Sequence, residues 1–481
     1  MKFKAKICFK SIDYGGFAQM GTEKTKEAFF IKDKSFYKTL FRMLIIVALQ
    51  NIVAYSVNMA DNIMLGSYSQ EALSGAATVN QIFFMVQQFA LSIGNALVAL
   101  SAQYWGQNRP APIRTLTGIS LKLGLIISAC ILLICGFFPE LVLRIFTDSP
   151  EIIAEGKAYL LMVMWSFALF IITNVLMAAL RAVGTVNISF YISVVSLIVN
   201  VSINYVLIFG KFGFPEMGIR GAAVGTLIAR ILELVIVVIY IARVDQKLRL
   251  FQRDMWHFNR ELKQDYTKVY LPIMCAQVLW GVSVPMQTAI LGHLSADAIA
   301  ANSVATTFYQ YLKVVVIAMS STSAVMIGNA IGRGERQHIR AAGRTLSVID
   351  VIIGIALGLA LIALRKPLLS LYSLNDNATT LALRLIVLMG FIMIGMSYQM
   401  PVSFGVIQGG GDTTFTMKMN MICTWCIVMP LSFMAAFWWK WPVVLVVLVI
   451  QSDQLFKCLP VFVHFRKYQW MKKLTREETA K

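Results

Sequence analysis

Twelve long apolar segments constrain this chain more than any other feature of its sequence. A membrane-spanning helix needs about 20 consecutive, mostly apolar residues. Only 14% of the 481 residues are charged, against roughly a quarter in soluble globular proteins. The sequence therefore predicts an all-α membrane protein with twelve transmembrane helices. The segments are 43–66, 76–102, 117–138, 159–180, 188–209, 219–242, 269–292, 298–328, 347–364, 381–406, 417–437 and 441–465.

Basic residues are distributed unevenly among the connections between these segments. Lys and Arg gather in the two terminal stretches and in the even-numbered connections, whereas the connections 67–75 and 293–297 contain neither. Cytoplasmic loops of membrane proteins are enriched in Lys and Arg. We therefore expect a multi-pass protein of the plasma membrane with both termini in the cytoplasm. The net charge of +19 is then explained by loops beside anionic lipid rather than by nucleic-acid binding.

An internal repeat relates the first six segments to the last six. A shift of 226 residues superposes Leu65-Gly66 on Leu291-Gly292 and Gly106 on Gly332. An even number of helices in each unit makes such repeats parallel, so we expect two six-helix lobes around a central cleft. The predicted domains are an N-terminal tail 1–38, an N-terminal lobe 39–243, a basic linker 244–268, a C-terminal lobe 269–465 and a C-terminal tail 466–481.

Asp61 is a carboxylate inside the first apolar segment, five residues before Gly66. At 1.5 Å per residue it lies about 7 Å from the outer end of its helix. A carboxylate at the centre of a membrane helix costs about 3 kcal/mol on insertion scales, and such residues usually serve a function. Asp61 is therefore the first candidate for a group that couples an ion to transport.

Three other polar residues fall in the same outer layer as Asp61. Counted from the outer ends of their helices, Asn204, Asn200 and Thr226 lie roughly 9, 15 and 12 Å deep. Asn200 and Asn204 are four residues apart, so they share a helix face. Carboxylate, carbonyl and hydroxyl oxygens are donors that hard cations prefer, and Asp61 could instead hold a proton. The alternative is that these side chains only tie helices together by hydrogen bonds.

Short motifs recur in a fixed order along almost the whole chain from the first apolar segment onward. They are DNIMLG at 61–66, EALSG at 71–75, LRAVG at 180–184, GKFG at 210–213, GIRGAA at 218–223, Leu271-Pro272 and QGGGD at 408–412. In this order and spacing, the chain resembles the multidrug and toxic compound extrusion (MATE) family.

The resemblance implies two six-helix lobes, a V-shaped cleft and the export of organic compounds driven by inward Na⁺ or H⁺. It also implies a transporter without an enzymatic cofactor. Four positions of this sequence match the cation site of the family's N-terminal lobe, and a fifth residue, on the fourth predicted helix, is a further candidate. These residues are Asp61, Asn200, Asn204, Thr226 and, as the fifth, Asn174.

The C-terminal lobe departs from part of that family. Some members carry carboxylates in the stretches that correspond to 275–287 and 391–402, where this chain has no Asp or Glu. Gln287, the repeat counterpart of Asp61, is neutral. We therefore expect coupling in the N-terminal lobe alone, and no metal site beyond a possible Na⁺ site at Asp61, Asn200 and Asn204.

Other charged residues also lie inside the apolar segments, and five of them form two close pairs and one isolated lysine. Arg230 and Glu233 are three residues apart, and Asp453 and Lys457 are four apart. Both spacings allow pairing within one helix, so structural ion pairs are expected. Lys313 is near the middle of the eighth segment, with no acid nearby in sequence. It could set the charge preference of the cleft or pair with a distant acid.

The predicted function is a cation-coupled antiporter that exports amphiphilic or cationic organic compounds by alternating access. Its predicted partners are small molecules and the lipid bilayer, and the chain is expected to be monomeric. The alternative is a flippase for lipid-linked precursors, whose cavity usually carries several cationic residues. An enzyme is not expected, because no nucleotide-binding motif is present and the histidines, His257, His293, His338 and His464, are scattered.

Overall fold

The structure is a computed structural model, and it describes residues 29–257, 259–292, 296–334, 336–370 and 376–476. Within these ranges the chain is helical and has no strand, and twelve helices are long and apolar enough to cross a membrane. The prediction of an all-α fold with twelve membrane-spanning helices is confirmed. Of the two predicted tails, residues 1–28 and 477–481 lie outside the described ranges.

The first six spans are single helices. The first of them begins at Lys34, so residues 34–38 of the predicted tail are already helical. Two of these helices begin with proline, which has no N–H to leave unpaired in a first turn. The spans are α1 (Lys34–Tyr68), α2 (Gln70–Gly106), α3 (Pro110–Phe137), α5 (Pro150–Ala182), α6 (Asn187–Ile208) and α7 (Ile219–Arg243), with short α4 (Pro139–Arg144) and α8 (Arg253–Trp256) in connections.

The last six spans include three that are interrupted. The unbroken helices are α9 (Arg260–Gly292), α10 (Ala296–Arg333) and α11 (Arg336–Ala363), followed by short α12 (Arg365–Leu369). The tenth span is α13 (Asp376–Met400) with a π-helical continuation, Pro401–Ile407. The eleventh alternates α14 (Thr413–Asn420), π-helical Met421–Val428, α15 (Met429–Phe433) and π-helical Met434–Trp438. The twelfth comprises α16 (Val443–Gln451), α17 (Asp453–Phe456) and α18 (Cys458–Lys467).

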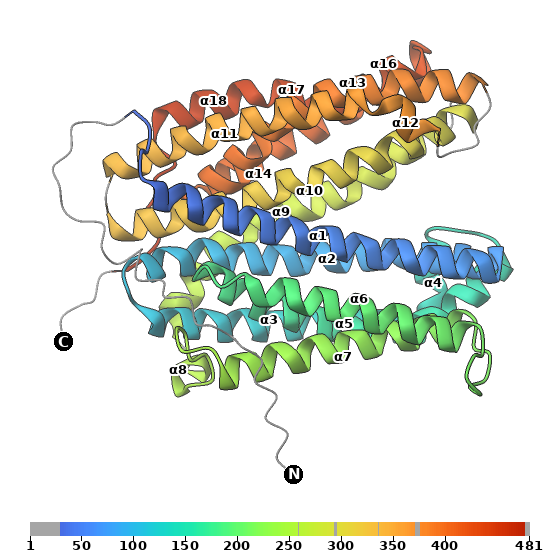
Figure 1. Cartoon of the computed structure of the whole chain (residues 1–481), viewed down its shortest axis with the longest axis horizontal. Coiled ribbons are helices and arrows are strands. Elements are labelled where there is room, and N and C mark those ends of the chain that lie inside the picture. The colour runs from blue at the N-terminus through green and yellow to red at the C-terminus, as the bar shows by residue number, and fades with distance from the viewer. Residues whose placement is uncertain (1–28, 258, 293–295, 335, 371–375, 477–481) are drawn as a thin grey trace.

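The helices form two groups that lie side by side along the length of the molecule. Helices α1 to α7 make one group and α9 to α18 the other, and α1 runs along the boundary between them (Figure 1). Helix α1 contacts α2 and α6 on its own side and α10 on the other. Because α6 also contacts α7, three helices with candidate site residues pack next to one another.

Two repeat-equivalent glycines join the two groups where α2 and α10 cross. A Cβ atom on Gly106 would lie 2.2 Å from the Asn329 carbonyl oxygen, and one on Gly332 would lie 2.1 Å from the Gln103 carbonyl oxygen. Backbones can approach this closely only because both residues lack a side chain. The 226-residue shift found in the sequence thus relates two residues that pack against each other.

A C-terminal strap, residues 468–476, closes the same end of the molecule. Gln103 of α2 donates to the Lys472 carbonyl oxygen (3.1 Å) and accepts from the Leu474 backbone N–H (2.8 Å). The Lys472 N–H donates to the Gly410 carbonyl oxygen (2.9 Å). The Arg476 guanidinium pairs with Asp265 of α9 at 2.5 Å. This part of the predicted C-terminal tail is therefore folded across both groups of helices.

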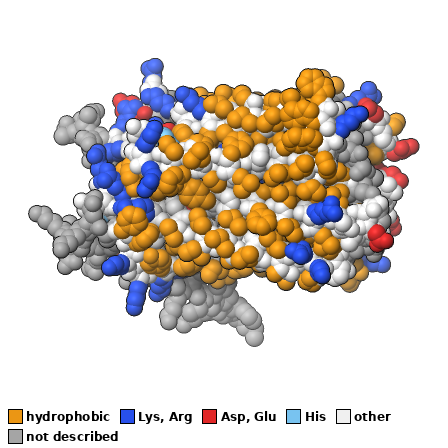
Figure 2. Space-filling view, turned by 90° about the horizontal axis from the view of Figure 1, so that it is seen from above, with side chains coloured by type: hydrophobic (Ala, Val, Ile, Leu, Met, Phe, Trp, Pro, Cys, Tyr) orange, Lys and Arg blue, Asp and Glu red, His pale blue; other side chains and the backbone are white. Residues whose placement is uncertain are grey.

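The surface shows the division between lipid-facing and water-facing regions that a membrane protein needs. On the face seen in Figure 2, hydrophobic side chains cover the long middle part, and Lys and Arg gather at one end. That end, at the left in both views, is where α1 begins and where the chain's C-terminal stretch lies.

We expect the substitution Gly332→Ala to destabilise the fold, because its methyl group would overlap the α2 backbone. Overpacking of this kind costs about 1–3 kcal/mol, and it would appear as a lowered melting temperature of the purified protein. Gly136→Ala is the matched control, since its nearest neighbour would be a Met164 methyl carbon at 3.8 Å. Equal melting temperatures for the two variants would contradict the close crossing of α2 and α10.

Candidate cation-coupling site

A hydrogen-bonded chain of polar side chains links α1, α6 and α7. The Asn204 amide nitrogen donates to Asp61 Oδ1 at 2.7 Å and lies 3.3 Å from Asn200 Oδ1. The Asn200 amide nitrogen in turn donates to Thr226 Oγ1 at 3.4 Å. Both asparagines are buried, with exposures of 1% or less. The structure therefore brings together four of the five residues that sequence reasoning named.

The Asn204 carbonyl oxygen is an acceptor without a donor. It is buried and has no hydrogen-bond partner within the described ranges. Gly225 on α7 makes room for this oxygen, because a Cβ atom there would lie only 1.9 Å from it. A buried acceptor normally has a hydrogen-bond partner, since burying it without one costs roughly 1–3 kcal/mol. The oxygen thus packs against α7 at Gly225, while the amide nitrogen of the same side chain faces Asp61.

Tyr159 of α5 extends the polar chain, and sequence reasoning missed it. Its side chain is 5% exposed, hydrogen-bonds Thr226 and lies within electrostatic reach of Asp61. Helix α5 begins at Pro150, so Tyr159 is about 14 Å along it. That depth falls in the same layer as Asn200 and Thr226. The predicted fourth segment begins at Tyr159 itself, so counting from the end of that segment placed this residue at the membrane surface.

Arg230 lies one turn beyond Thr226 on α7 and within electrostatic reach of Asp61. Its guanidinium donates to both Glu233 carboxylate oxygens at 2.8 and 3.1 Å. It also stacks over the rings of Phe170 and Phe83, with its Cζ atom 4.9 and 5.8 Å from their centroids. The expected ion pair is therefore present, and aromatic rings enclose its cation.

Asn174 lies apart from this chain. Its side-chain oxygen would be 3.6 Å from a Cβ atom on Gly94 of α2, so it packs at the α2–α5 contact. Counting residues had placed it on a plausible helix, but depth does not determine which way a side chain faces. Lys313 could either be a cleft charge or pair with a distant acid. Its ammonium nitrogen lies 5.0 Å from the Trp280 ring centroid and within electrostatic reach of Asp453.

Asp350 of α11 is a second carboxylate whose environment the sequence did not reveal. Its side chain is in the middle of the helix and 1% exposed, and neither carboxylate oxygen has a hydrogen-bond partner in the described ranges. The site at Asp61 differs because it offers several oxygens together. Among the described residues, no group of three or more His, Cys, Asp and Glu side chains could hold a metal ion.

Comparison with known proteins identifies a single family. The MatE family model matches residues 47–206 and again 272–434, and together these segments cover more than half of the chain. The two matches begin 225 residues apart, which agrees with the internal repeat.

Curated relatives align over most of their length. A probable multidrug resistance protein of Thermotoga maritima is 23% identical over 92% of this chain and 95% of its own. A probable multidrug resistance protein of Rhizobium meliloti is 27% identical over 85% and 91%.

Solved structures share the fold. A MATE transporter of Vibrio cholerae superposes with a TM-score of 0.82 at 19% identity, covering 92% of this chain and 98% of that one. A multidrug resistance MATE family transporter in an outward-facing conformation also gives 0.82, at 17% identity over 91% and 98%.

We expect Glu233→Gln to lower the stability of the fold, because it leaves the Arg230 charge in the membrane region without its counter-ion. Breaking a buried pair on one side costs on the order of 3 kcal/mol. The double variant Arg230→Gln/Glu233→Gln should melt at a higher temperature than Glu233→Gln alone. Glu140→Gln is the control, because it removes one side of an exposed ion pair with Lys157. A Glu233→Gln variant as stable as this control would show that the pair is dispensable.

Proposed function

The chain belongs to the MATE family of membrane transporters, and from this premise we propose that it is a cation-coupled antiporter for organic compounds. In this proposal, Na⁺ or H⁺ moving inward drives the export of amphiphilic or cationic molecules by alternating access. The relatives named as probable multidrug resistance proteins support organic substrates.

The observation that carries this proposal is the carboxylate of Asp61 within a polar chain. Asp61 bonds Asn204, and Asn200 bonds Thr226, so α1, α6 and α7 share one hydrogen-bonded group. A carboxylate oxygen, the unpartnered Asn204 carbonyl oxygen and a hydroxyl suit a bound Na⁺. Asp61 with a proton would serve H⁺ coupling through the same residues. A purely structural role would explain the hydrogen bonds between these helices but not why the Asn204 side-chain oxygen lacks a donor.

The positions of these residues support the proposed coupling. Asp61 is on α1, which contacts both groups of helices. A cation on Asp61 changes the charge at that boundary, and it favours whichever arrangement of α1 and α6 holds it better. A ligand shifts such an equilibrium only by its difference in affinity for the two states. In the proposed cycle the cation binds from outside, expels the substrate and is released to the cytoplasm.

The orientation, the domains and the assembly state complete the proposal. In this proposal, the end of the molecule where Lys and Arg gather (Figure 2) faces the cytoplasm, because cytoplasmic loops are enriched in these residues. The lobes 39–243 and 269–465 move against each other about the linker 244–268, and the chain works as a monomer. Reporter fusions at the C-terminus test the orientation, and light scattering of the purified protein tests the assembly state.

We expect Asp61→Asn to abolish gradient-driven efflux of fluorescent cationic dyes, because the amide can neither bind nor release the coupling ion. Proteoliposomes with imposed pH or Na⁺ gradients, applied separately, identify which ion is used. Asp148→Asn is the control, since it removes an exposed carboxylate of the same lobe between α4 and α5. Unchanged efflux by Asp61→Asn at wild-type protein levels would contradict the proposal.

We expect Gly225→Ala to impair transport although it removes no polar group. Its methyl group would occupy the space of the Asn204 carbonyl oxygen and displace that residue from Asp61. Displacing a supporting residue of an ion site costs about tenfold or more in affinity or activity. The measurement is the cation concentration for half-maximal efflux, with Gly136→Ala as the control. Wild-type cation dependence in Gly225→Ala would mean that Asn204 plays no part in ion binding.

A further inference from the structure

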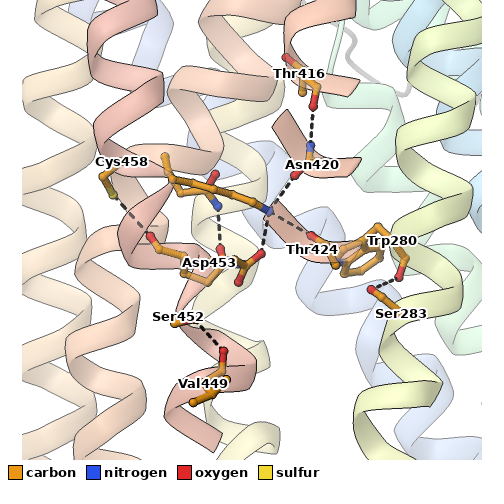
Figure 3. Close-up of polar contacts among 12 residues, drawn as sticks. Trp280, Ser283, Thr416, Asn420, Thr424, Val449, Ser452, Asp453 and Cys458 are labelled. Carbon is orange, nitrogen blue, oxygen red and sulfur yellow. Dashed lines mark hydrogen bonds and ion pairs between the residues drawn. The ribbon is translucent and has the colours of Figure 1, made fainter. Parts of the chain in front are cut away.

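A lysine ammonium lies at the centre of a second polar cluster, in the other group of helices. Lys457, between α17 and α18, is 3% exposed. Its Nζ atom lies 2.7 Å from Asp453 Oδ2, 2.9 Å from Asn420 Oδ1 and 3.3 Å from Thr424 Oγ1. Figure 3 shows Asn420, Thr424 and Asp453 converging from two neighbouring helical spans. Three oxygens of different chemistry thus surround one buried cation.

The surroundings fix the orientation of these oxygens. The Asn420 amide nitrogen donates to the Thr416 carbonyl oxygen (3.0 Å). This bond turns the side-chain oxygen of Asn420 toward Lys457. The second oxygen of Asp453 accepts from Gln454 (2.8 Å), and Gln454 accepts in turn from Gln399 (2.6 Å). Two of the three partners, Asn420 and Asp453, are therefore also held by hydrogen bonds that do not involve the ammonium.

The cluster has the same kinds of oxygen as the site at Asp61. Each consists of a carboxylate, an amide carbonyl and a hydroxyl, and each draws on the fifth and sixth spans of its repeat. Under the 226-residue shift, Asn420 falls six residues before Asn200, which is roughly 9 Å along the helix. The difference lies in the occupant. The polar groups around Asp61 bond one another, whereas Asn420, Thr424 and Asp453 all bond Lys457.

We propose that the Lys457 ammonium is a tethered cation that fills a cation site formed by Asp453, Asn420 and Thr424. With Lys457 in place, this half of the protein carries its own counter-charge and takes no ion from solution. Without Lys457, the same oxygens form a site for a small monovalent cation such as Na⁺ or K⁺. This inference goes beyond the proposed function, because it does not require Asp61 to couple transport.

The test measures binding of radiolabelled Na⁺ and of K⁺ by the full-length protein in nanodiscs. All comparisons use the Asp61→Asn background, so the result is independent of the site at Asp61. This background should bind neither ion, and adding Lys457→Ala should create one saturable site per chain. Adding Asp453→Asn to that variant should abolish the new site, because its carboxylate provides the charge.

A second ammonium near Asp453 requires its own control. Lys313 acts electrostatically on Asp453, so it could move into the vacated position. The variant Lys457→Ala is therefore compared with Lys457→Ala/Lys313→Met. No bound Na⁺ or K⁺ in either folded variant would overturn the proposal, and so would a site that survives Asp453→Asn.

Two further measurements complete the test. The first applies if the variant is unstable, and the second uses the wild-type protein. If Lys457→Ala is unstable, NaCl or KCl should raise its melting temperature relative to N-methyl-D-glucamine chloride at equal ionic strength. Equal instability in all three salts counts against the proposal. In the wild-type protein, the proposal allows one alkali-cation site at most, and a second one would overturn it.

Discussion

The structure depends on one constraint, which is that hydrocarbon offers no partner to a polar group. Polar side chains inside the membrane region therefore find partners on their own helix or on a neighbouring one, and bonds between helices bear on how the helices pack. Arg230 is paired with Glu233 and enclosed by aromatic rings, and Lys457 is surrounded by three oxygens. The Asn204 side-chain oxygen has no such partner among the described residues, and under the proposed function a movable ion binds beside it.

The two halves of the molecule meet the constraint in different ways, although they derive from one repeat. In the first half a carboxylate on α1 stands at the boundary between the halves, among neutral amides and a hydroxyl. In the second half the carboxylate is on α17 and its counter-charge is only four residues away. Gln287 occupies the position equivalent to Asp61. The proposed coupling and the proposed tethered cation thus assign an exchangeable charge to one half of a duplicated framework and a permanent charge to the other.

Much of the fold could be predicted because its signals are local or periodic. Length and hydropathy determine twelve spans, and the spacing of Arg230 and Glu233 requires no knowledge of tertiary structure. The repeat even related Gly106 to Gly332. Depth along a helix predicted that Asp61 and Asn204 share a layer. Rotation about the helix axis is not encoded so simply. Asn174 was therefore grouped with Asp61, although it packs at the contact of α2 and α5, and Tyr159 was missed. Two partners of Lys457, Asn420 on α14 and Thr424 in the π-helical stretch after it, lie more than 30 residues away in the sequence. Local spacing therefore could not predict them.

The C-terminal strap bears on how such a protein is made. Its residues are the last of the described chain to leave the ribosome, and they bond Gln103, Gly410 and Asp265, which belong to three distant parts of the sequence. The strap can form only after every span has been synthesised and both groups of helices have met. Among the described residues, this end of the molecule is therefore fastened only after the helices that it joins have been made.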